Sequence, residues 1–306
     1  MSSIETREML TMRRILWLAA VAAAALAGAL AGGSPAATTG PCGRSAAAFT
    51  KVLWIVMENK NYSSVIGSSS APYENALAAK CGLATNYHAI SHPSLPNYIA
   101  MTSGSTHGVS DDGSPSSHPL SGASVFSQGR PAKSYEESMP SSCYLSDSGL
   151  YRVHHNPEAY YTSVRTACKS GGDVPMGTVS SGSFHNALIA GKLPRFSLVT
   201  PNMCHDTHDC SVATGDSYLK SLVPAILAAP DYQAGRLALF LTWDENDGLS
   251  GNRVPTIVVS PHVPAGTRSG TRFTHYSLLR TAEELLGVPL LRNAQTAASM
   301  RAAFRL

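Results

Sequence analysis

The sequence has few charged residues and lacks the basic clusters that mark a nucleic-acid-binding protein. Asp, Glu, Lys and Arg make up 14% of the 306 residues, the net charge is +3, and no run of Lys or Arg follows the N-terminal region. A dispersed charge of this size argues against a nucleic-acid partner. Hydrophobic residues make up 43% of the chain, which predicts a globular protein with a substantial core.

Two motifs that would point to other chemistry are absent from the sequence. Without a C-x-x-C pair, a zinc cluster held by thiolates is disfavoured, and without G-x-S-x-G the acyl-transfer triad of the α/β-hydrolases is disfavoured too. An even number of cysteines in an exported chain instead predicts disulfides. Six cysteines allow fifteen pairings, of which the simplest joins neighbours: Cys42–Cys81, Cys143–Cys168 and Cys204–Cys210.

Long apolar runs are confined to the N-terminal region. There, two arginines precede an Ala- and Leu-rich stretch that runs into Gly, Ser and Pro, which is the pattern of a secretory signal. We expect residues 1–36 to be a signal peptide that is removed, with Met12 as an alternative start and a permanent anchor as the less favoured alternative. No later segment reaches the roughly 18 apolar residues of a spanning helix. The protein is therefore expected to be secreted or otherwise extracytoplasmic, without a stable membrane anchor.

Short apolar runs that end in polar residues alternate with helix-like segments in the rest of the chain. Runs rich in Val, Ile and Leu are typical of strands buried on both faces of a parallel sheet, and they lie within 51–62, 193–206, 235–248 and 253–263. Helices are expected within 96–104, 217–232 and 275–288. The alternation predicts an α/β fold with a mostly parallel central sheet flanked by helices. We expect a single domain over 42–306, with an irregular insertion around 109–185.

Polar residues follow three of the expected strands. Because the carboxyl ends of parallel strands share one edge of a sheet, these residues are expected to converge there; they are Glu58 and Asn59, the segment 202–209, and Asp244 with Glu245. Carboxylate and amide oxygens suit a hard divalent cation. Two adjacent carboxylates after a buried strand are unfavourable unless something neutralises them. The alternative is a solvated turn with no ligand.

The segment His92 to Asn97 places Ser94 between two prolines, just before an expected helix. It could be an ordinary turn and helix start. It could also present Ser94 as a nucleophile, which at neutral pH needs a base or a metal to activate it. Asn97 could then hold an oxygen of the transferred group.

Histidines supply the remaining candidates. The segment 205–210 holds two His-Asp dipeptides, whose histidines could ligate a metal, bind a phosphate or donate a proton. His275 lies where a helix is expected to begin, either as a cap or as an anion ligand.

Six motifs together resemble a known family. "VMENKNY", "HPSLPNYIAMTSG", "YRVHHNP", "PNMCHDTHDC", "TWDEND" and "THYSLLRTAEELLG" follow one another between about residues 50 and 290. They resemble the bacterial phosphoesterase family that contains acid phosphatases and phospholipase C enzymes, within the alkaline-phosphatase-like superfamily. The resemblance implies an alkaline-phosphatase-like sandwich and metal-dependent phosphoryl transfer.

The resemblance also implies roles for individual residues. Ser94 would be the nucleophile that carries a phosphoserine intermediate, and Asn97 would bind the phosphate. One divalent ion, which could be zinc, calcium, manganese or iron, would be held by Glu58, Asn59, Ser94, Asp244 and Glu245. Groups that face the phosphate or donate a proton would be His155, Asp206, His208 and His275, with His208 as the candidate for protonating the leaving group. Glu245 and Asn202 stand where two-zinc members have other ligands, which favours one metal.

The function expected from these features is that of a secreted acid phosphatase acting on small phosphate esters. The first alternative is a phospholipase C, which would act on phospholipid head groups; the chain shows no added lipid-docking module or amphipathic basic helix, which favours soluble esters. The alternative from another class is a non-catalytic extracellular metal-binding protein. The oligomeric state is not predicted.

Overall fold

The core of the fold is an eight-stranded sheet with the strand order β5-β4-β6-β1-β7-β8-β2-β9. The computed structural model describes residues 40–44, 48–249 and 251–306, so the expected signal peptide lies outside the described residues. Strand β8 runs antiparallel to β7 and β2, and the other neighbours in the sheet run parallel. The predicted α/β fold with a mostly parallel sheet is confirmed. The strands are β1 (Lys51–Met57), β2 (Gly82–Ala84), β4 (Ala132–Glu136), β5 (Asp173–Pro175), β6 (Phe196–Thr200), β7 (Leu237–Trp243), β8 (Thr256–Val259) and β9 (Thr267–Ser269).

The central strands are apolar along their whole length because both faces of the sheet are covered. All seven residues of β7 are buried, as are six of the seven in β1. Side chains alternate between the two faces of a strand, so a strand covered on one face would show polar residues at every second position. A separate two-stranded parallel sheet joins β3 (Tyr87–His88) to β10 (Phe273–Thr274).

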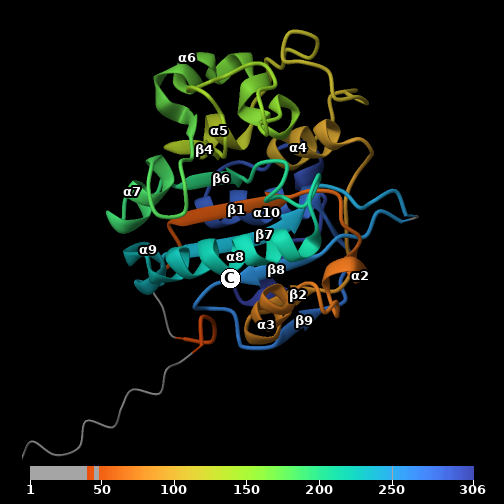
Figure 1. Ribbon diagram of the computed structural model, residues 1–306, viewed down its shortest axis with the longest axis vertical. Coiled ribbons are helices and arrows are strands. Elements are labelled where there is room, and N and C mark those ends of the chain that lie inside the picture. Colours follow the sequence, from red (N-terminus) through yellow and green to blue (C-terminus); the bar gives the residue numbers. More distant parts are fainter. Residues whose placement is uncertain (1–39, 45–47, 250) are drawn as a thin grey trace, which may run out of the picture. The chain divides into compact units, whose positions relative to one another are not determined.

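Helices cover the sheet on both faces. Helix α8 (Val212–Ala228) crosses the front of the sheet in Figure 1 together with α3 (Pro72–Lys80), while α10 (His275–Leu286) lies behind β1 and packs against α4 (Ser94–Ser103). The Oγ of Ser211 caps α8 by accepting a hydrogen bond from Thr214 N. The shorter helices are α2 (Tyr62–Val65), α5 (Val125–Gln128), α6 (Arg165–Ala167), α7 (Ser183–Ile189), α9 (Pro230–Gln233) and α11 (Arg301–Phe304).

The segment around 109–185, expected to be irregular, supplies β4 and β5 at one edge of the sheet. Between these strands the chain forms single turns of helix, among them 3₁₀ turns over Val153–His155 and Pro157–Tyr160. Such short elements lack a repeating apolar pattern, which is why the sequence shows no periodicity there.

The cysteines pair with their neighbours in sequence, as Cys42–Cys81, Cys143–Cys168 and Cys204–Cys210. The predicted disulfides are thereby confirmed. Among the described residues, every helix is too short or too polar to cross a bilayer.

Candidate active site

Three loops meet at the carboxyl edge of the sheet, because β1 lies between β6 and β7. Glu58 directly follows β1, Asp244 directly follows β7, and Asp206 lies in the loop after β6. Backbone hydrogen bonds join these loops: Asp244 N donates to Met57 O at 2.9 Å, and Glu58 N donates to Asp206 O at 2.8 Å. The expected convergence of Glu58 and Asp244 therefore follows from strand order, and Asp206 joins them.

The three carboxyl groups are fully buried. Burial, followed by the neighbouring Asp244 and Asp206, raises the pKa of Glu58 well above its usual value. Burial also raises the pKa of Asp206 to about 8 and that of Asp244 to about 6. Oδ2 of Asp206 and Oδ2 of Asp244 have no hydrogen-bond partner. Like charges and unpartnered oxygens this close together are stable only with protons or a cation among them.

His155 adds a nitrogen donor to this group. Its Nε2 lies 3.4 Å from Glu58 Oε2, and its Nδ1 lies 3.8 Å from Asp206 Oδ2. Burial holds the pKa of His155 well below its usual value, so the ring is neutral and has a lone pair to offer. Ligand atoms of Glu58, His155 and Asp206 lie within 4.8 Å of one another. Two carboxylates and an imidazole at this spacing fit a divalent metal ion.

Asn59 lies against the same carboxylates. With its amide nitrogen turned toward them, it donates to Glu58 Oε2 and Asp244 Oδ1, each at 3.1 Å. With the oxygen turned inward, the amide would instead supply a third oxygen ligand. The backbone of Asn59 is left-handed, with φ of 46°, a conformation that Asn adopts more readily than most residues. Its N–H donates to Asp244 Oδ1 at 3.2 Å, which fixes the turn to the site.

Ser94 is the first residue of α4 and points at the carboxylates. Its Oγ donates to Glu58 Oε2 at 3.2 Å, and the residue is 4% exposed. The hydroxyl of Tyr98, one helical turn later, donates to the other oxygen of Glu58. The sequence did not single out Tyr98, because a tyrosine in an apolar helix is usually a core residue. The signal would have been its spacing of four from Ser94, which places both side chains on one face of the helix.

Asn97 braces the loop that leads to Ser94. Its Oδ1 accepts hydrogen bonds from Ile90 N at 2.9 Å and Ser91 N at 3.0 Å, and its Nδ2 donates to Ser91 O at 2.9 Å. The same Nδ2 lies 3.5 Å from Glu245 Oε2. The amide expected to bind phosphate therefore also holds the loop that positions the serine.

Glu245 forms a pair with His92, which the sequence did not identify as a site residue although it lies in the Ser94 motif. His92 Nδ1 lies 2.6 Å from Glu245 Oε2. Burial, followed by the adjacent Asp244, raises the pKa of Glu245 to about 9.

The other two histidines lie in different surroundings. His208 is exposed, its ring centroid is 6.1 Å from that of His155, and its Nδ1 lies 2.8 Å from Asp209 Oδ1, so it stands at the mouth of the site. His275 is fully buried, with Nε2 2.5 Å from Asp244 O and Nδ1 3.0 Å from the Tyr87 hydroxyl. Burial lowers the pKa of His275 to about 4. Both of its ring nitrogens contact protein atoms, so neither is left to bind a phosphate. His275 instead helps to position the backbone of Asp244.

Known proteins that are similar to this chain in sequence are phosphatases, which agrees with the geometry of the site. The chain is 31% identical over 288 residues to phosphatidylinositol-3-phosphatase of Mycobacterium tuberculosis, which covers 93% of this chain and 92% of that protein. It is also 31% identical over 259 residues to the phosphate-repressible acid phosphatase of Penicillium chrysogenum, covering 80% of this chain but only 60% of that longer protein.

A solved structure supports the fold. A protein of the alkaline phosphatase superfamily from Vibrio parahaemolyticus superposes with a TM-score of 0.55 at 11% identity, covering 85% of this chain and 72% of that one. The model of the phosphoesterase family matches residues 54–289, a span that includes all the residues described above. The chain belongs to the phosphoesterase family.

Proposed function

We propose that this phosphoric ester hydrolase is a secreted, metal-dependent phosphomonoesterase of the acid phosphatase type, with Ser94 as its nucleophile. The observation that carries the proposal is the hydrogen bond from Ser94 Oγ to Glu58 Oε2, 3.2 Å, within a buried group of carboxylates. A serine hydroxyl is a poor nucleophile unless its surroundings favour loss of the proton. Here the hydroxyl lies among the groups best suited to hold a cation.

One divalent ion would be held by Glu58, Asn59, Ser94, Asp244 and Glu245, with His155 and Asp206 as further candidate ligands, because His155 Nε2 faces the same oxygen of Glu58 as Ser94 does. The neutral imidazole favours zinc, manganese or iron over calcium. When bound, the ion supplies positive charge that lowers the pKa of a nearby hydroxyl and screens the approach of an oxyanion to a phosphate.

The side chains of this protein then carry the transfer. Ser94 Oγ releases its proton toward Glu58 and bonds to phosphorus, while the bond from phosphorus to the alcohol oxygen breaks. His208, at the open mouth, donates a proton to that oxygen. Water next attacks phosphorus and gives a proton back to His208, the bond from phosphorus to Oγ breaks, and Ser94 regains its proton from Glu58 as inorganic phosphate leaves.

The test is hydrolysis of p-nitrophenyl phosphate by the mature chain across acidic to neutral pH. We expect Ser94→Ala to lower kcat by about 10⁴-fold or more, because the attacking atom is gone. Brief incubation with a ³²P-labelled monoester and an acid quench should label the wild-type peptide that contains Ser94. Ser105→Ala, just past the other end of α4, is the matched control and should retain both rate and label.

Near wild-type turnover in Ser94→Ala would refute the nucleophile. A parallel assay with p-nitrophenylphosphorylcholine separates the alternatives: preference for this diester would favour a phospholipase C. Absence of hydrolysis of either ester after metal is restored would favour a non-catalytic metal-binding protein.

A lipid-borne phosphomonoester is a second candidate substrate, favoured by apolar residues near the site. Leu150 and Leu249 are 43% and 54% exposed. Leu150 O accepts a hydrogen bond from Met203 N, in the loop that carries Asp206, and Leu249 O accepts one from the amide of Asn246, next to Glu245. Exposed leucines on loops beside a site are suited to insertion into a lipid interface. The relative from Mycobacterium tuberculosis is named for a phosphoinositide.

The double variant Leu150→Ser, Leu249→Ser distinguishes the two substrates. If lipid is used, it should lower phosphate release from phosphatidylinositol 3-phosphate in vesicles by at least about tenfold, with little change on p-nitrophenyl phosphate. Ile189→Ser, an exposed apolar residue on α7, is the control. Equal losses on both substrates would remove the lipid candidate.

A further inference from the structure

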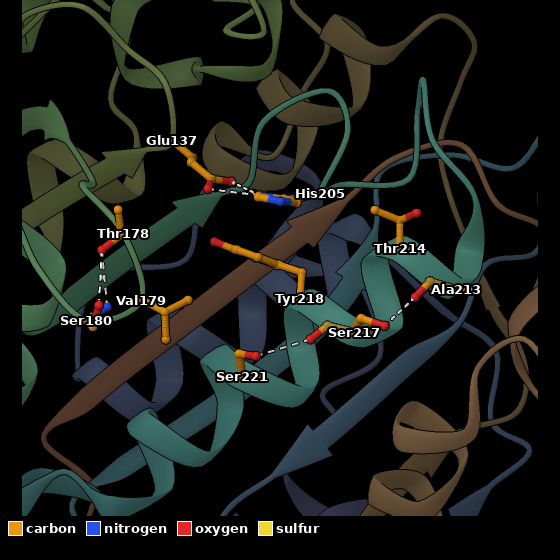
Figure 2. Close-up of a pocket in the computed structure, with 10 residues that line it drawn as sticks. All are labelled: Glu137, Thr178, Val179, Ser180, His205, Ala213, Thr214, Ser217, Tyr218 and Ser221. Carbon is orange, nitrogen blue, oxygen red and sulfur yellow. Dashed lines mark hydrogen bonds and ion pairs between the residues drawn. The ribbon is translucent and has the colours of Figure 1, made fainter.

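A cavity of about 750 Å³ lies next to the loop that carries Asp206. Figure 2 shows it between α8, the segment Thr178 to Ser180, and the pair Glu137 and His205. The side chain of His205 lines this cavity, while that of the adjacent Asp206 faces His155. None of the lining residues belongs to the group of carboxylates around Ser94.

Hydroxyl groups dominate the lining. Thr178, Ser180, Thr214, Ser217 and Ser221 contribute aliphatic hydroxyls, and Tyr218 contributes a phenol. Three of these hydroxyls already donate within the protein, Ser217 to Ala213 O, Ser221 to Ser217 O and Tyr218 to Met176 Sδ, so toward a ligand they act as acceptors. The aliphatic side chains of the lining are those of Val179 and Ala213, and together with the carbon atoms of the other lining residues they make a large part of the cavity surface apolar.

Charge in the cavity is closely balanced. Glu137 is the carboxylate of the lining, and no Lys or Arg is among the lining residues. His205 Nδ1 lies 2.9 Å from each oxygen of Glu137, and Glu137 Oε2 accepts a hydrogen bond from Asn202 N at 3.0 Å. The hydrogen bond to Glu137 raises the pKa of His205, so the two form an ion pair. A free anion such as phosphate would meet a carboxylate whose cationic partner is already engaged, so an anionic ligand is disfavoured.

Two rings form a flat wall. The ring of Tyr218 stacks on that of His205, with centroids 4.3 Å apart and planes 12° apart. In Figure 2 the Tyr218 side chain extends from α8 into the space below Glu137. An aromatic ring offers an apolar face and, for tyrosine, a polar tip. A sugar or cyclitol ring matches this wall, because it has a face of C–H groups and a rim of hydroxyls.

We propose that this cavity is a binding site for an uncharged polyhydroxylated ligand, a sugar or a cyclic polyol, separate from the catalytic centre. The hydroxyls of α8 and of the segment Thr178 to Ser180 bind the rim of the ligand, Glu137 accepts from two of its hydroxyls, and the Tyr218 ring supports its C–H face. Glu137 also holds Asn202 and His205, so the ligand contacts the loop on which Asp206 stands.

The test uses saturation-transfer NMR on the full mature chain, with maltose and myo-inositol as probes. We expect transfer to at least one probe, unchanged by saturating inorganic phosphate and unchanged in Ser94→Ala, because the cavity and the catalytic centre share no residue. Ser217→Tyr adds a ring at an exposed position of α8 that lines the cavity, and it should weaken binding by at least about tenfold. Lys220→Tyr, an exposed position on the same helix outside the lining, is the control.

Three results would overturn the proposal: no transfer to either probe, binding that persists in Ser217→Tyr, or displacement of the probe by inorganic phosphate. The last would place the probe in the catalytic centre. Hydrolysis of p-nitrophenyl phosphate by Ser217→Tyr reports independently that the variant is folded.

Discussion

Among the described residues, two groups of three buried carboxyl side chains lie in and beside the sheet, and one of them forms the candidate active site. The first, at the carboxyl edge of the sheet, consists of Glu58, Asp206 and Asp244. The second, in the region of β4 and β5, consists of Glu136, Glu158 and Asp173. All six are nearly or fully buried, and burial raises the pKa of each.

The second group is held by protons and neighbours, although Oδ1 of Asp173 and Oε2 of Glu158 have no hydrogen-bond partner. Asn156 Nδ2 donates to Asp173 Oδ2 at 2.9 Å, and Thr200 Oγ1 donates to Glu136 Oε1 at 3.3 Å. Burial raises the pKa of Asp173 to about 7 and that of Glu158 to about 8, so these groups stay largely protonated in acid. The cysteines beside Asp173 are joined in a disulfide and offer no thiolate to a metal.

The first group differs in what surrounds it. A neutral imidazole, a serine hydroxyl and an amide all face its oxygens, and the exposed His208 stands at its mouth. Buried carboxyl groups and donors to them are therefore common to both groups, whereas the imidazole and the candidate nucleophile belong to the first. The residues that surround a buried carboxylate therefore distinguish a candidate active site better than the pKa of the carboxylate does.

The largest expected effect is a difference in kcat between variants of the first group and variants of the second. Asp244→Asn should lower kcat on p-nitrophenyl phosphate by about 10³-fold or more, because it removes a negative oxygen from the proposed metal shell. Glu158→Gln, which mimics a protonated acid, should leave kcat within about twofold. Similar losses in both variants would show that the second group also takes part in turnover.

Removal of the proposed metal ion by a chelator should also distinguish the two groups, through its effect on the Tm. A bound ion stabilises the folded state by mass action, so a chelator should lower the Tm of the wild type by several degrees. In Asp244→Asn the Tm should respond little, whereas in Glu158→Gln it should respond as in the wild type. A chelator response lost only in Glu158→Gln would move the metal to the second group. Differential scanning calorimetry gives each value.

The pH dependence of stability should report on the second group. Burial raises the pKa of Glu158 from 4.5 to about 8, so its folded form binds a proton that the unfolded chain has lost. This contribution is fully present below about pH 4.5 and is lost as pH rises through 8. Glu158→Gln should therefore match the wild type near pH 4.5 and exceed it by roughly 1–3 kcal/mol at pH 8. Urea denaturation at both values measures this, and a constant difference would contradict the assignment.

The smallest effect tests the contact between the groups. Thr200 Oγ1 lies 3.3 Å from Glu136 Oε1 and 3.3 Å from the backbone oxygen of His155. Thr200→Val keeps the shape and removes both hydrogen bonds, which should lower the free energy of unfolding by about 1 kcal/mol. We expect kcat to change by less than about threefold. A much larger fall in kcat would mean that the second group positions His155.

Those parts of the fold that follow from local pattern could be predicted. Strands β1 and β7 are apolar throughout because both faces are covered, and the convergence of Glu58 with Asp244 follows from parallel strands ending at one edge. The direction of β8 could not be predicted, since its residues, TIVV, are equally apolar in either direction.

The remainder of the site depends on contacts distant in sequence. His275 was placed correctly at a helix start, yet nothing local shows that its ring turns toward Asp244 O, 31 residues away. The second group was not foreseen, because Glu136, Glu158 and Asp173 come from an aperiodic segment and meet only after β4 and β5 pair. Tyr98 was not predicted to be a site residue, because the apolar pattern of its helix is typical of core residues.

The left-handed backbone of Asn59 restricts what mutation can place there. Glycine would adopt the same conformation but would remove the amide, and aspartate would add another negative charge beside Glu58 and Asp244. Glutamine would keep the amide but would disfavour the backbone and shift the group by one carbon. None of these three substitutions meets both demands, so we expect position 59 to tolerate less change than the proposed ligands with ordinary backbone conformations.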